Sequence, residues 1–106
     1  MNNEPLLQIE VRLSSEQMLV FEGVCLGRVV ALDHDGSIRR QFSVYSCEPG
    51  FVLESLDWSS GGKVRSRAER CDEDIDIYHF FGNEPLANYL YGVLRLNVPG
   101  LRFVNV

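Results

Sequence analysis

The segment KVRSRAERC (residues 63–71), followed by DEDIDIYHFFGNEPLANYLYGVL (72–94), decides the fold of this chain. In its first part Val64, Ser66 and Ala68 alternate with charged residues, which is the two-residue period of a β-strand. From residue 72 onward the apolar residues take up the spacing of helices instead. The chain therefore changes from strands to helices near residue 72.

Two helices are predicted after this change. The acidic run 72–74 suits a helix N-terminus, where carboxylates face the positive end of the helix dipole, and Gly82 is expected to end that helix. Asn83 is expected to cap a second helix that has Pro85 in its first turn. The apolar faces are expected to comprise Ile75, Tyr78 or His79, and Phe80 in the first helix, and Leu86, Tyr89, Leu90, Val93 and Leu94 in the second.

Upstream of residue 63 the sequence predicts strands joined by turns. Residues 7–13 alternate most cleanly between apolar and polar side chains. Together with the helices, the strands predict an α+β fold, in which a single antiparallel meander of five to six strands, which could be curved, packs against a C-terminal helical segment. The other strands are expected at 18–22, 24–32, 39–47 and 51–58, and the turns and loops at 14–17, 33–36, 48–50 and 59–62.

The length of 106 residues predicts one domain, because two separate cores would each bury too little apolar surface. We expect a single α+β domain over residues 1–106, with a flexible N-terminus at residues 1–5. Residues 97–106 form an apolar tail, in which Leu101 and Phe103 could pair with the chain's own sheet or contact a second copy.

Composition excludes several classes of partner. The formal charge of −5 disfavours binding to nucleic acids and to anionic membranes, since like charges repel. No apolar run reaches the roughly 18 residues that span a bilayer, and no signal peptide is recognisable at the N-terminus. We therefore expect a cytoplasmic protein. Its cysteines, Cys25, Cys47 and Cys71, form no CxxC motif and are expected to be reduced.

No catalytic motif is recognisable. His34 lies in an acidic turn and His79 in a predicted helix, so they do not share a metal-binding motif. The serines lack a GxSxG context, and the glycines at 61–62 lead into a strand instead of a Walker helix. We predict no catalytic residue, no metal site and no cofactor; enzymatic activity is disfavoured but left open.

A basic stretch and the aromatic residues are the candidates for binding. The cations of residues 63–70, with Arg39 and Arg40 on a neighbouring strand, could bind a carboxylate or phosphate. Alternatively, they could form a solvated sheet face paired with Glu54, Asp57 or Glu69. The aromatic residues could line a cleft between sheet and helices, or could belong to the core. The candidate ligand-binding residues are Trp58, Arg65, Arg67 and Tyr78.

Residues 78–91, YHFFGNEPLANYLY, follow the predicted hairpin VYSCEPGFVLES (residues 44–55). This stretch of sequence resembles short uncharacterised bacterial proteins of the mobile gene cassette type, in which a β-meander ends in FFG and is followed by an LA-x-x-LY helix. The resemblance covers residues 20–94. It implies no activity and no catalytic residue.

Two functional hypotheses follow. The first is a soluble interaction module that works as a homodimer, because the apolar tail and the sheet offer more apolar surface than one short helical layer can cover. The alternative is a protein that binds a small molecule or anion in a pocket between sheet and helices, and that could be an enzyme. Nucleic-acid binding through the basic strand ranks last, because the net charge opposes it.

Overall fold

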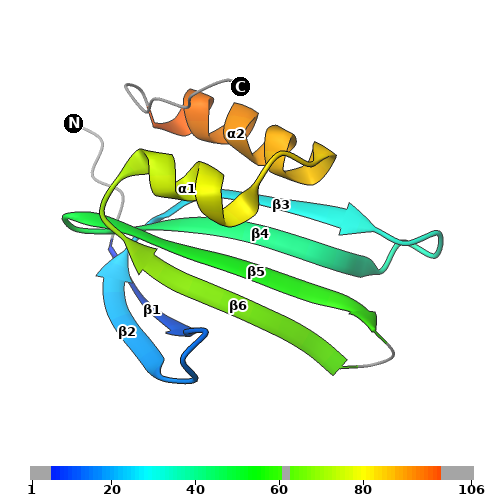
Figure 1. The fold of residues 1–106 in the computed structure, drawn as a ribbon, viewed down its shortest axis with the longest axis horizontal. Helices are drawn as coiled ribbons and strands as arrows, with labels where there is room; N and C mark the ends of the chain where they lie inside the picture. The colour runs from blue at the N-terminus through cyan, green and yellow to red at the C-terminus, as the bar shows by residue number, and fades with distance from the viewer. Residues whose placement is uncertain (1–5, 61–62, 99–106) are drawn as a thin grey trace.

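The computed structural model describes residues 6–60 and 63–98, which form six strands followed by two helices (Figure 1). The α+β class and the change from strands to helices after residue 71 are confirmed. Residues 1–5 and most of the predicted apolar tail, with Leu101 and Phe103, lie outside the described residues. In chain order the elements are β1 (Leu7–Arg12), β2 (Met18–Gly23), β3 (Cys25–Leu32), β4 (Ile38–Cys47), β5 (Gly50–Ser60), β6 (Lys63–Cys71), α1 (Asp74–Phe81) and α2 (Pro85–Asn97).

The described strands divide into two antiparallel sheets, where the sequence predicted one. β3, β4, β5 and β6 form a four-stranded sheet in chain order, and β1 pairs only with β2. Both helices cover one face of the larger sheet, which we call the front face (Figure 1). The β1–β2 hairpin lies against the opposite face, the back face, near the end where β6 leads into α1.

The division occurs at the junction between β2 and β3. Ser46 in β4 holds Val24 by two hydrogen bonds: its amide donates to the Val24 carbonyl at 2.8 Å, and its hydroxyl accepts from the Val24 amide at 2.9 Å. The backbone passes so close that a Cβ atom on Gly23 would lie 2.0 Å from the Ser46 carbonyl oxygen. Only glycine fits there, and the close crossing turns the hairpin under the sheet instead of beside it.

The front core fills the space between the larger sheet and the helices. The buried side of α2 consists of Ala87, Leu90, Tyr91 and Leu94. Tyr91 therefore faces the core, whereas the sequence predicted Tyr89 there. Gly27 in β3 leaves room for these side chains, since a Cβ atom there would lie 2.9 Å from a Leu94 methyl carbon. The remaining buried members are Val29, Phe42, Val44 and Leu53 from the sheet, and Ile77 and Phe81 from α1.

The back core lies between the larger sheet and the hairpin. Val11 and Phe21 of the hairpin are buried against Tyr45, Val52 and Ala68 of the sheet. Ala68 is 1% exposed, which confirms the predicted alternation of β6. Because alternate residues of one strand enter opposite cores, the four-stranded sheet is the middle layer of three.

Both helices begin later than predicted. α1 starts at Asp74 with Glu73 as its N-cap residue, and Ile77 and Phe81 form its buried face. α2 has Glu84 as its N-cap residue, because Pro85 takes the first helical position and the cap must precede it directly. Asn83 therefore lies one residue outside the helix.

Candidate functional site

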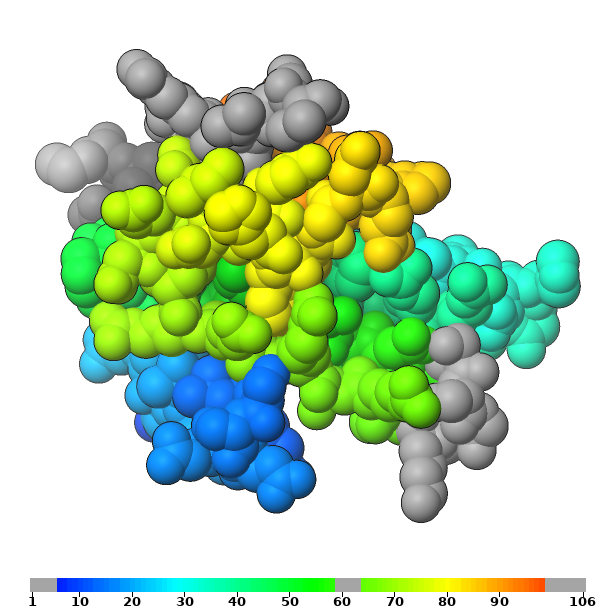
Figure 2. Space-filling model, viewed as in Figure 1, coloured from blue at the N-terminus to red at the C-terminus, as the bar shows by residue number. Residues whose placement is uncertain are grey.

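The hairpin covers only part of the back face. Beyond it, toward the β3–β4 turn and the ends of β5 and β6, no element among the described residues covers this face of the strands, and Figure 2 shows a hollow beside the hairpin. We call this surface the open half. Five apolar side chains at this end of the sheet are exposed. Strand alternation directs Val30, Leu32 and Val64 toward the open half, and Ile38 pairs with Leu32. Trp58 lies two residues after Leu56 in β5, where the pairing with β6 becomes irregular. These five residues are between 37% and 58% exposed.

A row of polar side chains crosses the back face between the hairpin and the open half. The Arg28 guanidinium donates to the Tyr45 hydroxyl at 2.8 Å and to the Ser43 hydroxyl at 3.0 Å. The Tyr45 hydroxyl donates in turn to the Glu54 carboxylate at 3.2 Å. Ser43 and Tyr45 are buried, so this chain satisfies polar groups that would otherwise be costly to bury.

The polar row contains one cation and one carboxyl group. Burial raises the pKa of Glu54, and burial together with the nearby Glu54 carboxylate raises the pKa of Tyr45. The phenol of Tyr45 therefore stays protonated at neutral pH and donates to Glu54.

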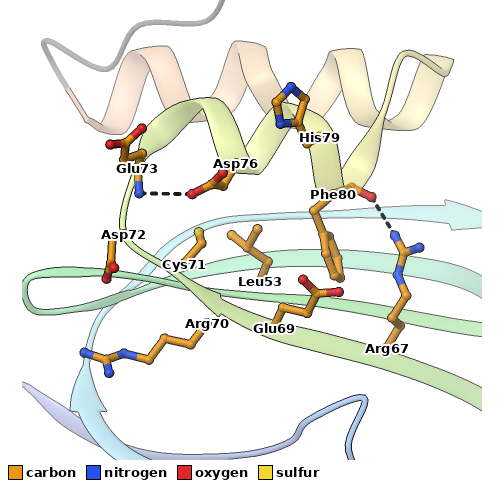
Figure 3. A pocket seen from close by; sticks show the side chains of 10 residues that line it. All are labelled: Leu53, Arg67, Glu69, Arg70, Cys71, Asp72, Glu73, Asp76, His79 and Phe80. Carbon is orange, nitrogen blue, oxygen red and sulfur yellow. Dashed lines mark hydrogen bonds between the residues drawn. The ribbon is translucent and has the colours of Figure 1, made fainter.

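A second concavity lies on the front side, between β6 and α1 (Figure 3). It encloses about 600 Å³. Arg67 reaches over the Phe80 ring, with the guanidinium carbon 4.2 Å from the ring centroid, and donates to the Phe80 carbonyl at 2.5 Å. In Figure 3, Arg70 extends away from α1, and His79 rises from the side of α1 that faces away from β6. The cleft is lined by Leu53, Arg67, Glu69, Arg70, Cys71, Asp72, Glu73, Asp76, His79 and Phe80.

The pKa of Cys71 is shifted by its surroundings in this cleft. Burial raises the pKa of its thiol to about 12, with further contributions from the carboxylates of Asp76, Asp72 and Glu69. The thiol is therefore protonated at neutral pH and is a poor nucleophile. The same carboxylates disfavour an anionic ligand by charge repulsion, and Arg67, one of the two arginines of the cleft, donates to the Phe80 carbonyl. Within the described residues, no three His, Cys, Asp or Glu side chains lie close enough together to hold a metal ion.

The structure does not bring the four predicted ligand-binding residues together. Arg67 lines the cleft, whereas Arg65 is exposed farther along β6, opposite Asp57. Tyr78 is half-buried against the front core, with its ring 5.8 Å from that of Tyr91. Trp58 belongs to the open half, on the other side of the sheet.

Sequence reasoning missed the polar row. Arg28, Tyr45 and Glu54 lie on three different strands, and only the strand register places them side by side. A polar residue at an inward position of an otherwise apolar strand, such as Ser43 between Phe42 and Val44, is the one signal that could have pointed to this row.

Comparisons with known proteins found no matching family model, no matching curated protein and no matching solved structure. Neither described helix has the length and apolar character needed to cross a membrane.

Proposed function

We propose that this protein is an interaction module that forms a homodimer through the open half of its back face. One observation carries the proposal: five apolar side chains are exposed on a sheet surface that no described element covers. Exposed apolar surface of this kind is typical of sites that bind another protein.

The charge distribution leaves the open half as the surface on which a second copy can bind. Two chains that each have a formal charge of −5 repel one another at long range, and contact is easiest where the surface is uncharged. The five exposed side chains of the open half are uncharged. A two-fold axis would place the same uncharged patch on both sides of the interface, with the two sheets stacked face to face.

The area of the patch indicates a weak dimer. The five exposed side chains offer on the order of 400 Å² per subunit. Two such patches, with a polar rim that includes Gln41 and Ser66, approach the lower end of specific interfaces, about 1,200 Å² in total. We therefore expect a dissociation constant in the micromolar range.

The proposal is tested by measuring the oligomeric state of the whole chain. Sedimentation equilibrium should show a dimer at about 100 µM and dissociation at about 1 µM. Trp58, the one tryptophan of the chain, lies within the proposed interface, so its fluorescence should shift to shorter wavelength as the concentration rises.

Charged substitutions supply the variants and their control. Leu32→Glu and Val64→Glu each place a carboxylate in the patch and should weaken the dimer at least about tenfold. Leu96→Glu is the matched control, since Leu96 is 84% exposed on α2 and lies outside the patch. A wild-type chain that stays monomeric at about 100 µM would refute the proposal. Equal dimerisation of the patch variants and the control would refute it as well.

A further inference from the structure

A groove lies on the front side of the sheet, between the N-terminal half of α2 and the ends of β3 and β4. It encloses about 470 Å³ and is separated from the open half by the sheet itself. Its walls combine apolar side chains with arginines. They are Ala31, Arg39, Arg40, Glu84, Pro85, Leu86 and Tyr89.

A β-bulge brings two consecutive arginines into this groove. Leu32 pairs with Ile38 and Ala31 pairs with Arg40, which leaves Arg39 as an extra residue in β4. In a regular strand, neighbouring side chains point to opposite faces, so only one of the two arginines could face the front. Because the bulge changes the direction of the backbone, both Arg39 and Arg40 line the groove.

The two arginines have different roles. Arg40 is fixed by a two-point ion pair with the Glu84 carboxylate, at 2.5 and 2.9 Å, and its guanidinium carbon lies 4.9 Å from the centroid of the Phe42 ring. This bond to Glu84 is the largest cause that raises the pKa of Arg40. Arg39 is exposed, and its guanidinium has no hydrogen-bond or ion-pair partner among the residues that the structure describes. One positive charge therefore remains available in the groove.

The apolar side of the groove comes from the first two turns of α2. Leu86 is half-buried against the front core, whereas Tyr89 is 65% exposed, with its ring at the wall of the groove. An exposed aromatic ring of this kind offers a flat apolar surface with a polar hydroxyl at its edge.

We propose that this groove binds a small aromatic carboxylate. The carboxylate accepts two hydrogen bonds from the Arg39 guanidinium, whose planar fork matches it. The aromatic ring of the ligand lies against Leu86 and Tyr89, and the ion pair between Arg40 and Glu84 holds the opposite wall in place. The inference is independent of the proposed dimer, which uses the other face of the sheet.

The probe for this site is indole-3-acetate, which combines an aromatic ring with one carboxylate. Amide chemical shifts of the isotope-labelled chain should change saturably around Ala31 and Tyr89, with a dissociation constant of about 1 mM or lower. Indole-3-ethanol, which lacks the charge, and acetate, which lacks the ring, should each bind at least about tenfold more weakly.

Two variants and one control locate the site. Arg39→Gln should weaken binding of indole-3-acetate about tenfold, and Tyr89→Ala should weaken it several-fold. Both residues are exposed, so the amide spectra of the variants should retain the dispersion of the folded chain. Arg65→Gln removes an exposed arginine from β6, outside the groove, and should leave binding unchanged.

Three results would overturn the inference. They are no saturable shift of the wild-type chain at about 10 mM probe, equal binding of indole-3-acetate and indole-3-ethanol, or equal binding by the Arg39→Gln and Arg65→Gln variants. None of these results bears on the dimer, because the oligomeric state is measured separately and without a probe.

Discussion

Tyr89 and Tyr91 lie two residues apart in α2 and have opposite surroundings. Tyr91 is buried, and its hydroxyl donates to the Gly82 carbonyl at 2.6 Å, which ties α2 to the end of α1. Burial raises the pKa of Tyr91 to about 12, so the hydroxyl retains its proton at neutral pH and can donate. Tyr89 is exposed in the groove.

Tyr91→Phe should therefore destabilise the fold by about 1 kcal/mol, because the Gly82 carbonyl loses a donor in a partly buried place. The free energy of unfolding in urea, followed by circular dichroism, measures this effect. Tyr89→Phe is the control and should change the stability by no more than a few tenths of a kcal/mol. Equal stabilities of the two variants would contradict the role given to the Tyr91 hydroxyl.

At the scale of single residues, the sequence predicts well which side chains can be buried. It predicts less well which side chains contact one another. The alternation of β6 placed Ala68 correctly, because one strand defines its own two faces. Tyr91 was missed, since a helix rich in apolar residues allows more than one buried stripe and only the position of the sheet selects between them. Arg39 and Arg40 were predicted to lie beside the cations of residues 63–70, but β5 separates β4 from β6. The β-bulge that places both arginines in the groove depends on the register of the partner strand and was not predicted.

Among the elements, the β1–β2 hairpin is held by few polar contacts outside its own ladder. The Ser14 amide donates to the Ala68 carbonyl at 2.9 Å, and the Ser14 hydroxyl accepts from the Ala68 amide at 3.1 Å. These bonds also satisfy part of the β6 edge, whose backbone groups could otherwise pair with another chain.

Ser14→Ala removes the hydroxyl and leaves the Ala68 amide without its acceptor. The expected cost is about 1 kcal/mol, concentrated in the hairpin, because the larger sheet and the helices do not depend on this bond. Hydrogen exchange of the β1 and β2 amides should become faster, while the amides of β4 and β5 keep their protection. Ser15→Ala, in the same exposed turn, should have no such effect. Uniform acceleration over the whole chain would contradict a local effect of Ser14 on the hairpin.

The order of the elements was predictable, but their division into layers was not. The strands stand out in the sequence because apolar and β-branched residues alternate between turn signals, and these are local properties. The separation of β1 and β2 depends on the contact between Gly23 and Ser46, which are far apart in the chain. Glycine at position 23 predicts an irregularity there, and it is compatible with a bulge, a turn or a close crossing.

For the molecule as a whole, the four-stranded sheet belongs to two cores. Val52 and Leu53 are neighbours in β5 and almost fully buried, and they belong to the back core and the front core respectively. The cores share their middle layer, so loss of either one exposes the sheet to water. We therefore expect the three layers to unfold together.

Val52→Ala and Leu53→Ala should each destabilise the fold, by about 2 and about 3 kcal/mol respectively, through lost apolar burial and the cavity left behind. In both variants the denaturation curves from circular dichroism and from Trp58 fluorescence should coincide, with the same denaturant dependence as the wild-type chain. A variant in which the two signals separate would show that one layer unfolds independently. Leu96→Ala is the exposed control on α2, outside both cores and outside the open half, and should have little effect.

At the scale of the whole molecule, the sequence did not predict which candidate site residues lie together. The exposed apolar residues and the arginines are all visible in the sequence, and Trp58, Arg65, Arg67 and Tyr78 were reasonable candidates by residue type. The structure distributes them over both faces of one sheet and a helix. Whether side chains meet at one site depends on the strand register and on the order of the layers. Neither can be read directly from one amino-acid sequence.

The bonds between Ser14 and Ala68 join positions 54 residues apart. A ribosome makes the chain from its N-terminus, so β1 and β2 emerge well before the strand that will hold them. Until β6 has been synthesised, the inward side chains Val11 and Phe21 have no complete surface to cover them. The β1–β2 hairpin thus reaches its final place only after β6 has been made, and until then its inward apolar side chains remain accessible to other chains.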